Sequence, residues 1–192
     1  MFANLLLFIL EAVIGFFSFL LVARFYMQWA RVPFRNQVGH FVVALTDWLV
    51  LPARRLIPGL AGLDLASLIP AVLAQSLLVL AEFWLRGFSF GSPALAAGLA
   101  ILGVGAVETI RIFVYLIIAV VLVAVVISWV NPYTPLAPLF ELLSRPFLQP
   151  IRRILPTIAN IDLSPLVLLL LLQIVLMFLA TARAALVPVI AG

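Results

Sequence analysis

The stretch PARRLIP at residues 52–58 recurs 98 residues later as PIRRILP at residues 150–156. Where the two copies differ, one apolar residue replaces another, so the hydrophobic character of the stretch is kept. The correspondence continues downstream, because Asp64 has the same place after the first copy as Asp162 has after the second. A repeat of this kind indicates that a duplicated unit is the building block of the fold.

The composition indicates a membrane protein. Hydrophobic residues make up 67% of the chain and charged residues only 9%, with a mean hydropathy of +1.34. Soluble domains have about 45–50% apolar and about 25% charged residues. Four apolar runs, at roughly 4–25, 67–85, 107–130 and 166–187, are long enough to cross a hydrocarbon core about 30 Å thick. The predicted fold is therefore an all-α membrane protein with four transmembrane helices.

The four spans group into two units, 1–86 and 107–192, joined by a connector at 87–106 that is rich in small residues. Each unit holds two spans and one motif-bearing loop, so both units begin and end on the same side of the membrane. The repeats are thus related in parallel rather than inverted. A single helix through the connector and the third span would be too long for the core. We therefore expect a break near Gly103 and Gly105.

The spans of the second unit carry clear end signals. Trp129 suits the headgroup level at the end of the third span, and Asn131 and Pro132 follow it as stop residues. The last span is preceded by Ser164, which we expect to be its N-cap, with Pro165 at the first helical position.

The arginines predict the orientation. All eleven basic residues are arginines, and the net charge is +4. Eight lie in or beside the two motif loops and three on the other side, which predicts cytoplasmic loops and external termini. In so apolar a chain, arginines are expected to face lipid phosphates and set topology rather than bind nucleic acid. The eight are Arg24, Arg31, Arg35, Arg54, Arg55, Arg145, Arg152 and Arg153, and the three are Arg86, Arg111 and Arg183.

Each box is predicted to be a short interfacial helix that one proline begins, two arginines occupy and a second proline ends. The apolar segment 41–51 before the first box is too short to cross and is expected to be interfacial or re-entrant. Two interpretations stay open: the boxes dock anionic lipid or an acidic partner, or they only anchor the topology. The equal spacing in both copies favours docking, with Arg145 as a further contact. The box residues are Pro52, Arg54, Arg55, Pro58, Pro150, Arg152, Arg153 and Pro156.

Two aspartates follow the boxes. Asp64 and Asp162 each come six residues after the last proline of a box and just before a span. Each is expected to accept hydrogen bonds from the arginines of its own box and so close the loop into a hook. The alternative is a carboxylate that favours the positive end of the following helix dipole.

Polar residues also occur inside the spans. Gln75 and Gln173 each lie eleven residues beyond their aspartate, hence about 16 Å deeper and near the midplane. We expect them at a pseudo-symmetric interface between helices, with a pore lining as the sharper alternative. Glu11 and Arg111 have corresponding places in the first spans of the two units and are expected to pair.

Enzyme chemistry has little support in the sequence. The chain has no cysteine and one histidine, His40, with no clustered ligands around it. No metal site, cofactor or catalytic residue is predicted, and we expect a protein that is not an enzyme.

The combination of SWVNP at 128–132, RPFLQPIRR at 145–153 and DLSP at 162–165 resembles the signature of the YggT family of bacterial and plastid membrane proteins. The resemblance covers nearly the whole chain. The first unit departs from it, because WARVP at 29–33 replaces the Trp-x-Asn-Pro stretch and Asp47 stands where the second unit has an arginine. Function is therefore expected to rest mainly on the second unit.

The resemblance implies a multi-pass protein of the bacterial inner membrane. It also implies links to cell division, to osmotic-stress tolerance and, in plastids, to assembly of a haem-bearing cytochrome complex and membrane organisation. Together with the boxes it favours a membrane scaffold that engages anionic lipid or a membrane-protein client, with homo-oligomers as a further expectation. The rival hypothesis is a small channel or transporter for ions.

Overall fold

The computed structural model describes residues 2–57, 63–87, 93–155 and 162–191. These residues form six helices, which confirms the all-α prediction. The helices α1, α3, α4 and α6 are long and apolar enough to cross a membrane. The bounds are Phe2–Trp29 for α1, Gln37–Leu56 for α2, Leu65–Leu85 for α3, Ala94–Val130 for α4, Ala137–Ile154 for α5 and Ser164–Ala191 for α6.

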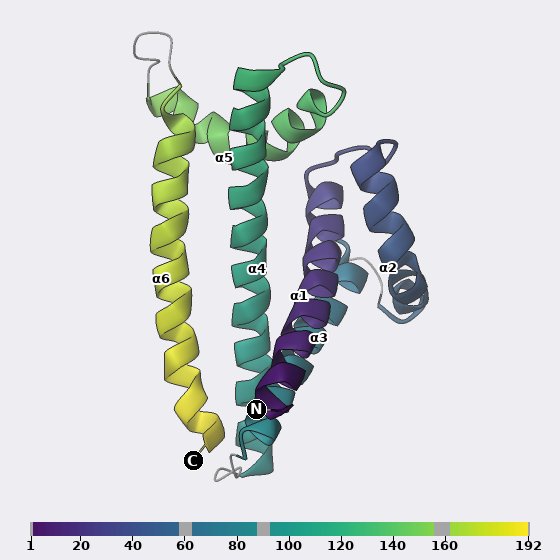
Figure 1. Cartoon of the computed structure of the whole chain (residues 1–192), viewed down its shortest axis with the longest axis vertical. Coiled ribbons are helices and arrows are strands. Elements are labelled where there is room, and N and C mark those ends of the chain that lie inside the picture. Colours follow the sequence, from purple (N-terminus) through teal and green to yellow (C-terminus); the bar gives the residue numbers. More distant parts are fainter. Residues whose placement is uncertain (1, 58–62, 88–92, 156–161, 192) are drawn as a thin grey trace.

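The two units have the same internal contacts. In the first, α2 packs on α1 and α3, and in the second α5 packs on α4 and α6. Contacts of α4 with α3 and α1 join the units. Both chain termini lie at the same end of the molecule, opposite the end that α5 crosses (Figure 1). The helix α2 begins near that end too, but it runs back along α1, so the two loop helices are placed differently (Figure 1).

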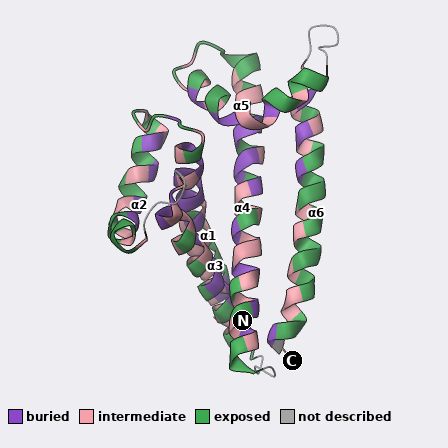
Figure 2. Ribbon diagram, turned by 180° about the vertical axis from the view of Figure 1, so that it is seen from behind, coloured by how far each residue is buried: buried purple, intermediate pink, exposed green. Residues whose placement is uncertain are grey.

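The outer surface is apolar, as a lipid-facing surface should be. Large side chains such as Phe8, Met177 and Phe178 are mostly exposed. Figure 2 shows that buried residues gather where α1, α3 and α4 meet, whereas much of α6 is open to the surroundings. The helix α6 is therefore the least buried of the four long helices, whereas α3 buries one face against α1 and α4.

The expected break in α4 is wrong. This helix runs unbroken for 37 residues, about 55 Å at 1.5 Å per residue, and so extends beyond a core about 30 Å thick. Its glycines serve helix packing instead. A Cβ atom on Gly105 would lie 2.1 Å from Ser76 Oγ and 2.8 Å from the Ser76 backbone nitrogen, and one on Gly103 would lie 3.3 Å from Leu186. Small residues let neighbouring helices approach closely.

The prediction that each box is a separate short helix is also wrong. The helices α2 and α5 continue through Pro52 and Pro150, and the box arginines occupy their last turns. The amphipathic segment upstream already forms a helix, so each box extends that helix rather than starting one. Basic residues at this end are favoured by the negative end of the helix dipole. The second prolines, Pro58 and Pro156, lie outside the described residues.

An aromatic cluster fastens the first unit to the second. The hydroxyl of Tyr26 on α1 donates to the carbonyl of Leu143 on α5. The Tyr26 ring centroid lies 5.4 Å from that of Phe113 on α4 and 6.0 Å from that of Phe147 on α5. Trp29 stacks on the same tyrosine at 5.9 Å. Aromatic pairs at such distances add about 0.5–1.5 kcal/mol each beyond the area they bury.

The end signals of the second unit are largely confirmed. The helix α4 ends at Val130, after an exposed Trp129 and directly before Asn131 and Pro132. The helix α6 begins at Ser164 itself, so Pro165 holds its second position rather than the first. The Ser164 backbone N–H donates to Asp162 Oδ1 at 2.9 Å. The aspartate therefore caps this end in place of the serine that the sequence predicted.

Candidate functional site

In the first unit the box is closed by an ion pair between an exposed arginine and a buried aspartate. Arg54 Nη2 lies 2.7 Å from Asp64 Oδ2, and Arg54 Nε donates to Asp64 Oδ1 at 3.3 Å. The same carboxylate accepts a hydrogen bond from Ser67 Oγ at 2.7 Å. Arg54 also donates to Gln28 Oε1 at 3.1 Å, which connects the box to the end of α1. The predicted arginine–aspartate hook is confirmed in this unit.

The environment of Asp64 favours its charged form. Burial by itself raises the pKa of the carboxyl, but the hydrogen bonds from Arg54 and Ser67 outweigh it and hold the pKa of Asp64 below its ordinary value of 3.8. The same hydrogen bond raises the pKa of Arg54. Both groups are therefore charged at neutral pH, and their charges offset each other.

The second unit repeats the hook in a more open form. Arg152 Nε lies 2.8 Å from Asp162 Oδ2. The Asp162 side chain is 33% exposed, against 4% for that of Asp64. Burial raises the pKa of the Asp162 carboxyl. Hydrogen bonds from Ser164 and Arg152 lower this pKa by more than burial raises it, so it also lies below 3.8. The hook is confirmed here too, but its carboxylate is more exposed than that of Asp64.

Five arginines form no ion pair with any described residue, and all five lie in the loops between the spans of a unit. All five are exposed. By contrast, the three arginines of the terminus side each have a carboxylate partner. The unpaired arginines are thus confined to the loops between the two spans of a unit. The five are Arg31, Arg35, Arg55, Arg145 and Arg153.

The terminus side holds an ion-pair network that joins three helices. Arg183 on α6 lies 3.2 Å from Glu82 on α3 and 2.9 Å from Glu108 on α4. Glu82 also pairs with Arg86, and Glu108 with Arg111. The predicted pair between Glu11 and Arg111 is therefore wrong. A carboxylate one helical turn away satisfies the arginine locally, and Glu11 is exposed on α1.

The two glutamines do not meet. Gln75 is buried and donates to Ser18 Oγ on α1 at 2.9 Å, so it bonds across helices within its own unit. Gln173 is exposed on α6 and makes no hydrogen bond to a described side chain. The predicted pseudo-symmetric interface is wrong, because α3 packs on both α1 and α4, whereas α6 packs on α4 and α5 and leaves the Gln173 face open.

A further polar contact of the first unit was missed by the sequence analysis. Arg24 is buried near the end of α1, where Nη1 lies 2.8 Å from Asp47 Oδ1 and donates to Thr46 Oγ1 at 2.8 Å. A lone arginine inside an apolar run was the available signal, since such a charge needs a partner. The position 98 residues later is Leu122, so the second unit has no equivalent.

Within the described ranges no three side chains of the metal-binding types come together. The arrangement instead offers guanidinium groups, which bind carboxylate or phosphate oxygens two at a time. Chemically, the site can bind anions at a membrane surface. The fold and this surface define a class: a multi-pass membrane protein of two parallel units that present unpaired arginines in the loops between their spans.

The chain belongs to the CCB3/YggT family, whose family model matches residues 3–85 and 104–183. The two matched segments agree with a duplicated unit. The chain is 36% identical to the uncharacterized protein YggT of Escherichia coli K12, over 95% of this chain and 93% of that protein. It is 33% identical to an uncharacterized protein of Pseudomonas aeruginosa, over 93% of this chain and 90% of that protein. No solved structure gives a significant match.

Proposed function

We propose that this protein is a non-enzymatic membrane scaffold whose motif loops hold an anionic bilayer surface. The observation that carries the proposal is the division of the arginines. Six of the eleven are paired with carboxylates, and the five unpaired ones all lie in the motif loops. If the arginines only set the topology, there would be no reason for carboxylates to pair with six of them and leave five exposed ones unpaired.

The hooks explain how the loops would present this charge. In each box the first arginine pairs with the aspartate, which fixes the end of α2 or α5. The second arginine, Arg55 or Arg153, stays exposed beside a highly exposed apolar residue: Leu56 is 84% exposed and Ile154 82%. Such a pair suits an interfacial helix, whose apolar side chain enters the acyl boundary while the guanidinium reaches phosphate. Each basic residue at an anionic surface contributes about 1 kcal/mol.

The test is the lipid preference of the reconstituted protein. Spin-labelled phosphatidylglycerol and phosphatidylcholine would be compared in nanodiscs for the fraction immobilised by the protein. We expect phosphatidylglycerol to be preferred and the preference to fall about fivefold for each of Arg55→Gln and Arg153→Gln. The control is Arg86→Gln on the terminus side, which should change nothing. An unaltered preference in the double variant would refute the proposal.

A membrane-protein client with an acidic segment could use the same arginines. It would be indicated if Arg55→Gln and Arg153→Gln left the lipid preference intact but abolished cross-linking to another membrane protein in cells. The apolar residues next to both arginines favour the lipid surface over such a client.

A channel or transporter has less support. Gln75 is buried against Ser18, and Gln173 faces outward, so these amides line no common path through one copy of the chain. Ion flux through vesicles that contain the protein tests this alternative. Flux that is lost in the Gln75→Leu/Gln173→Leu variant would favour a conduit.

We place the motif loops in the cytoplasm and both termini in the periplasm of a bacterial inner membrane, on the excess of arginines in the loops. Single cysteines are a suitable probe because the chain has none of its own. Arg35→Cys should be labelled only from the cytoplasm, and Arg86→Cys, exposed at the other end of the spans, only from the periplasm.

Gln173 favours a homo-oligomer. It lies nine residues into α6 from Ser164, about 14 Å along the helix, where an outward amide has no hydrogen-bond partner in lipid. A second copy packed on α6 would supply one. We expect Gln173→Cys to form a disulfide-linked dimer in the membrane, whereas Val13→Cys on the exposed face of α1 should not.

A further inference from the structure

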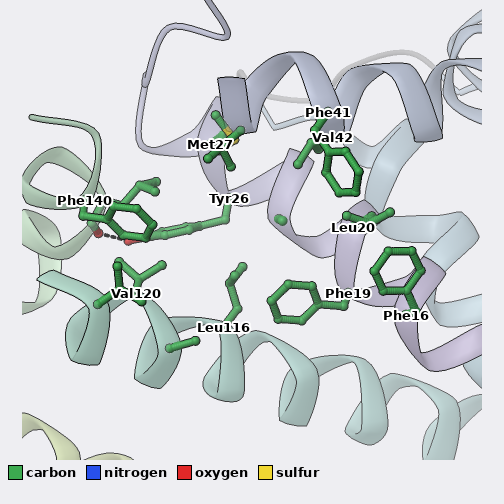
Figure 3. Close-up of a pocket in the computed structure, with 15 residues that line it drawn as sticks. Phe16, Phe19, Leu20, Tyr26, Met27, Phe41, Val42, Leu116, Val120 and Phe140 are labelled. Atoms are coloured by element: carbon green, nitrogen blue, oxygen red, sulfur yellow. Dashed lines mark hydrogen bonds between the residues drawn. The ribbon is translucent and has the colours of Figure 1, made fainter. Parts of the chain in front are cut away.

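An apolar cavity of about 310 Å³ lies between the two units. Figure 3 shows its walls: side chains of α1 and α2 from the first unit face side chains of α4 and α5 from the second. Among the described residues that line it, Tyr26 alone has a hydroxyl, which donates a hydrogen bond to the Leu143 carbonyl. The cavity therefore has no polar group left to bind water, and an apolar cavity of this kind stays dry.

The cavity has the depth of one membrane leaflet. Along α1 its wall runs from Met27, two residues before the end of the helix, to Phe16. These eleven steps correspond to about 16 Å, half the thickness of a core about 30 Å deep. The slot thus extends from the motif-side surface to the region of the midplane. It is not sealed, because Phe16 and Phe41 on its rim are half exposed.

Positive charge lies close to the surface end of this slot. Arg31 comes four residues after the wall residue Met27, and Arg35 comes three before the wall residue Val38. Both arginines are exposed and lack a carboxylate partner among the described residues. Their charge complements a phosphate, whereas a purely apolar occupant would not need them.

The backbone at Arg31 supports a role for its side chain. Arg31 has a φ of +54°, in the left-handed region that favours glycine. Its N–H donates to Gln28 O at 3.0 Å and the N–H of Val32 to Met27 O at 2.9 Å, the bonding pattern of a Schellman cap, where glycine is the usual residue. An arginine at this corner therefore costs backbone energy, which a side chain that binds a ligand would offset.

We infer that the slot holds one acyl chain of an anionic phospholipid from the motif-side leaflet, with the lipid phosphate bound by Arg31 and Arg35. The inference deepens the proposed function and rests on it for the lipid class. It adds a defined site to a general surface preference. Because the slot is walled by both units, the bound lipid would also join them.

The test is lipid retention by the detergent-purified chain, measured by native mass spectrometry after addition of phosphatidylglycerol or phosphatidylcholine. The wild-type chain should retain one phosphatidylglycerol and no phosphatidylcholine. In Ala119→Phe the ring fills the slot from α4, and retention should be lost. The matched control is Ala180→Phe, an exposed alanine of α6 away from the slot, which should retain the lipid. Retention by Ala119→Phe at the wild-type level would overturn the inference.

Arg31→Gly provides a second variant that does not threaten folding, since glycine suits the backbone there. It should weaken retention of phosphatidylglycerol about fivefold, and an unchanged affinity would count against the phosphate site. Arg55→Gln/Arg153→Gln separates the two proposals. This variant should keep the single bound lipid while losing the general preference for phosphatidylglycerol in nanodiscs. If Ala119→Phe loses the bound lipid while Arg55→Gln/Arg153→Gln keeps its preference for phosphatidylglycerol in nanodiscs, the lipid site in the slot is supported and the proposed binding surface at the boxes is refuted.

Discussion

The loop helices of the two units arise from one duplicated sequence but are tied down differently. In the first unit, α2 is held by Arg24 with Asp47 and by Arg54 with Asp64. In the second, the more open pair of Arg152 with Asp162 is the only ion pair of α5 among the described residues. The residue that corresponds to Asp47 is Arg145, so the charge is reversed and left unpaired. The helix α2 is thus held by more ion pairs than α5, whereas α5 carries two unpaired arginines, Arg145 and Arg153, against Arg55 on α2.

The largest expected effect is on the free energy of unfolding when each hook is broken separately. Asp64→Asn removes the charge from a buried carboxylate that serves both Arg54 and Ser67, and should lower the free energy of unfolding by about 2–3 kcal/mol. Asp162→Asn, at an exposed pair, should cost only about 0.5 kcal/mol. Thermal unfolding of the purified variants in detergent measures both. Equal losses would show that the two hooks do not differ as their burial suggests.

The next effect concerns the contact that only the first unit has. Arg24→Leu copies the residue at position 122 of the second unit and leaves Asp47 and Thr46 without their partner. We expect a loss of about 2 kcal/mol. The double variant Arg24→Leu/Asp47→Asn should recover part of it, because no unpaired charge remains. If the double variant is as unstable as the single one, the ion pair is not the cause.

A smaller effect of opposite sign is expected at the corner after α1. Arg31→Gly should stabilise the protein by about 1 kcal/mol, because glycine carries no penalty in the left-handed region. The second unit offers a comparison, since α4 ends at Asn131 with extended backbone and Asn131→Gly should give no such gain. A loss of stability in Arg31→Gly would mean that its side chain holds the fold.

The smallest effect is expected from mild acid. The folded pKa of Asp64 and that of Asp162 lie below the ordinary value of 3.8, so each ion pair contributes its full stability above about pH 4. That contribution is lost as the pH falls through the folded pKa of each group, and the larger share comes from the buried Asp64. This loss is measured as a fall in the protease resistance of the two loops between pH 5 and pH 3. A loop that weakens above pH 5 would point to another titrating group.

Much of the fold and part of the site could be predicted from the sequence. The four spans follow from apolar runs, which depend only on local composition. The hooks of Arg54 with Asp64 and of Arg152 with Asp162 follow from a conserved spacing within the chain itself. The unbroken α4 could not be predicted, because Gly105 interrupts a helix or admits a neighbour depending on what packs there.

The sequence by itself determined the number of helices long and apolar enough to span, the duplication and the loops that carry most of the arginines, since hydrophobicity and short spacings are local properties. Only the tertiary structure decided which polar groups meet. Gln75 is buried and Gln173 exposed although they occupy equivalent places, because α3 packs that face on α1, whereas nothing among the described residues covers that face of α6. The slot between the units likewise exists only when α1 and α2 of the first unit are packed against α4 and α5 of the second. Equivalent sequence gives equivalent helices, but the neighbours of each helix decide which of its faces is buried.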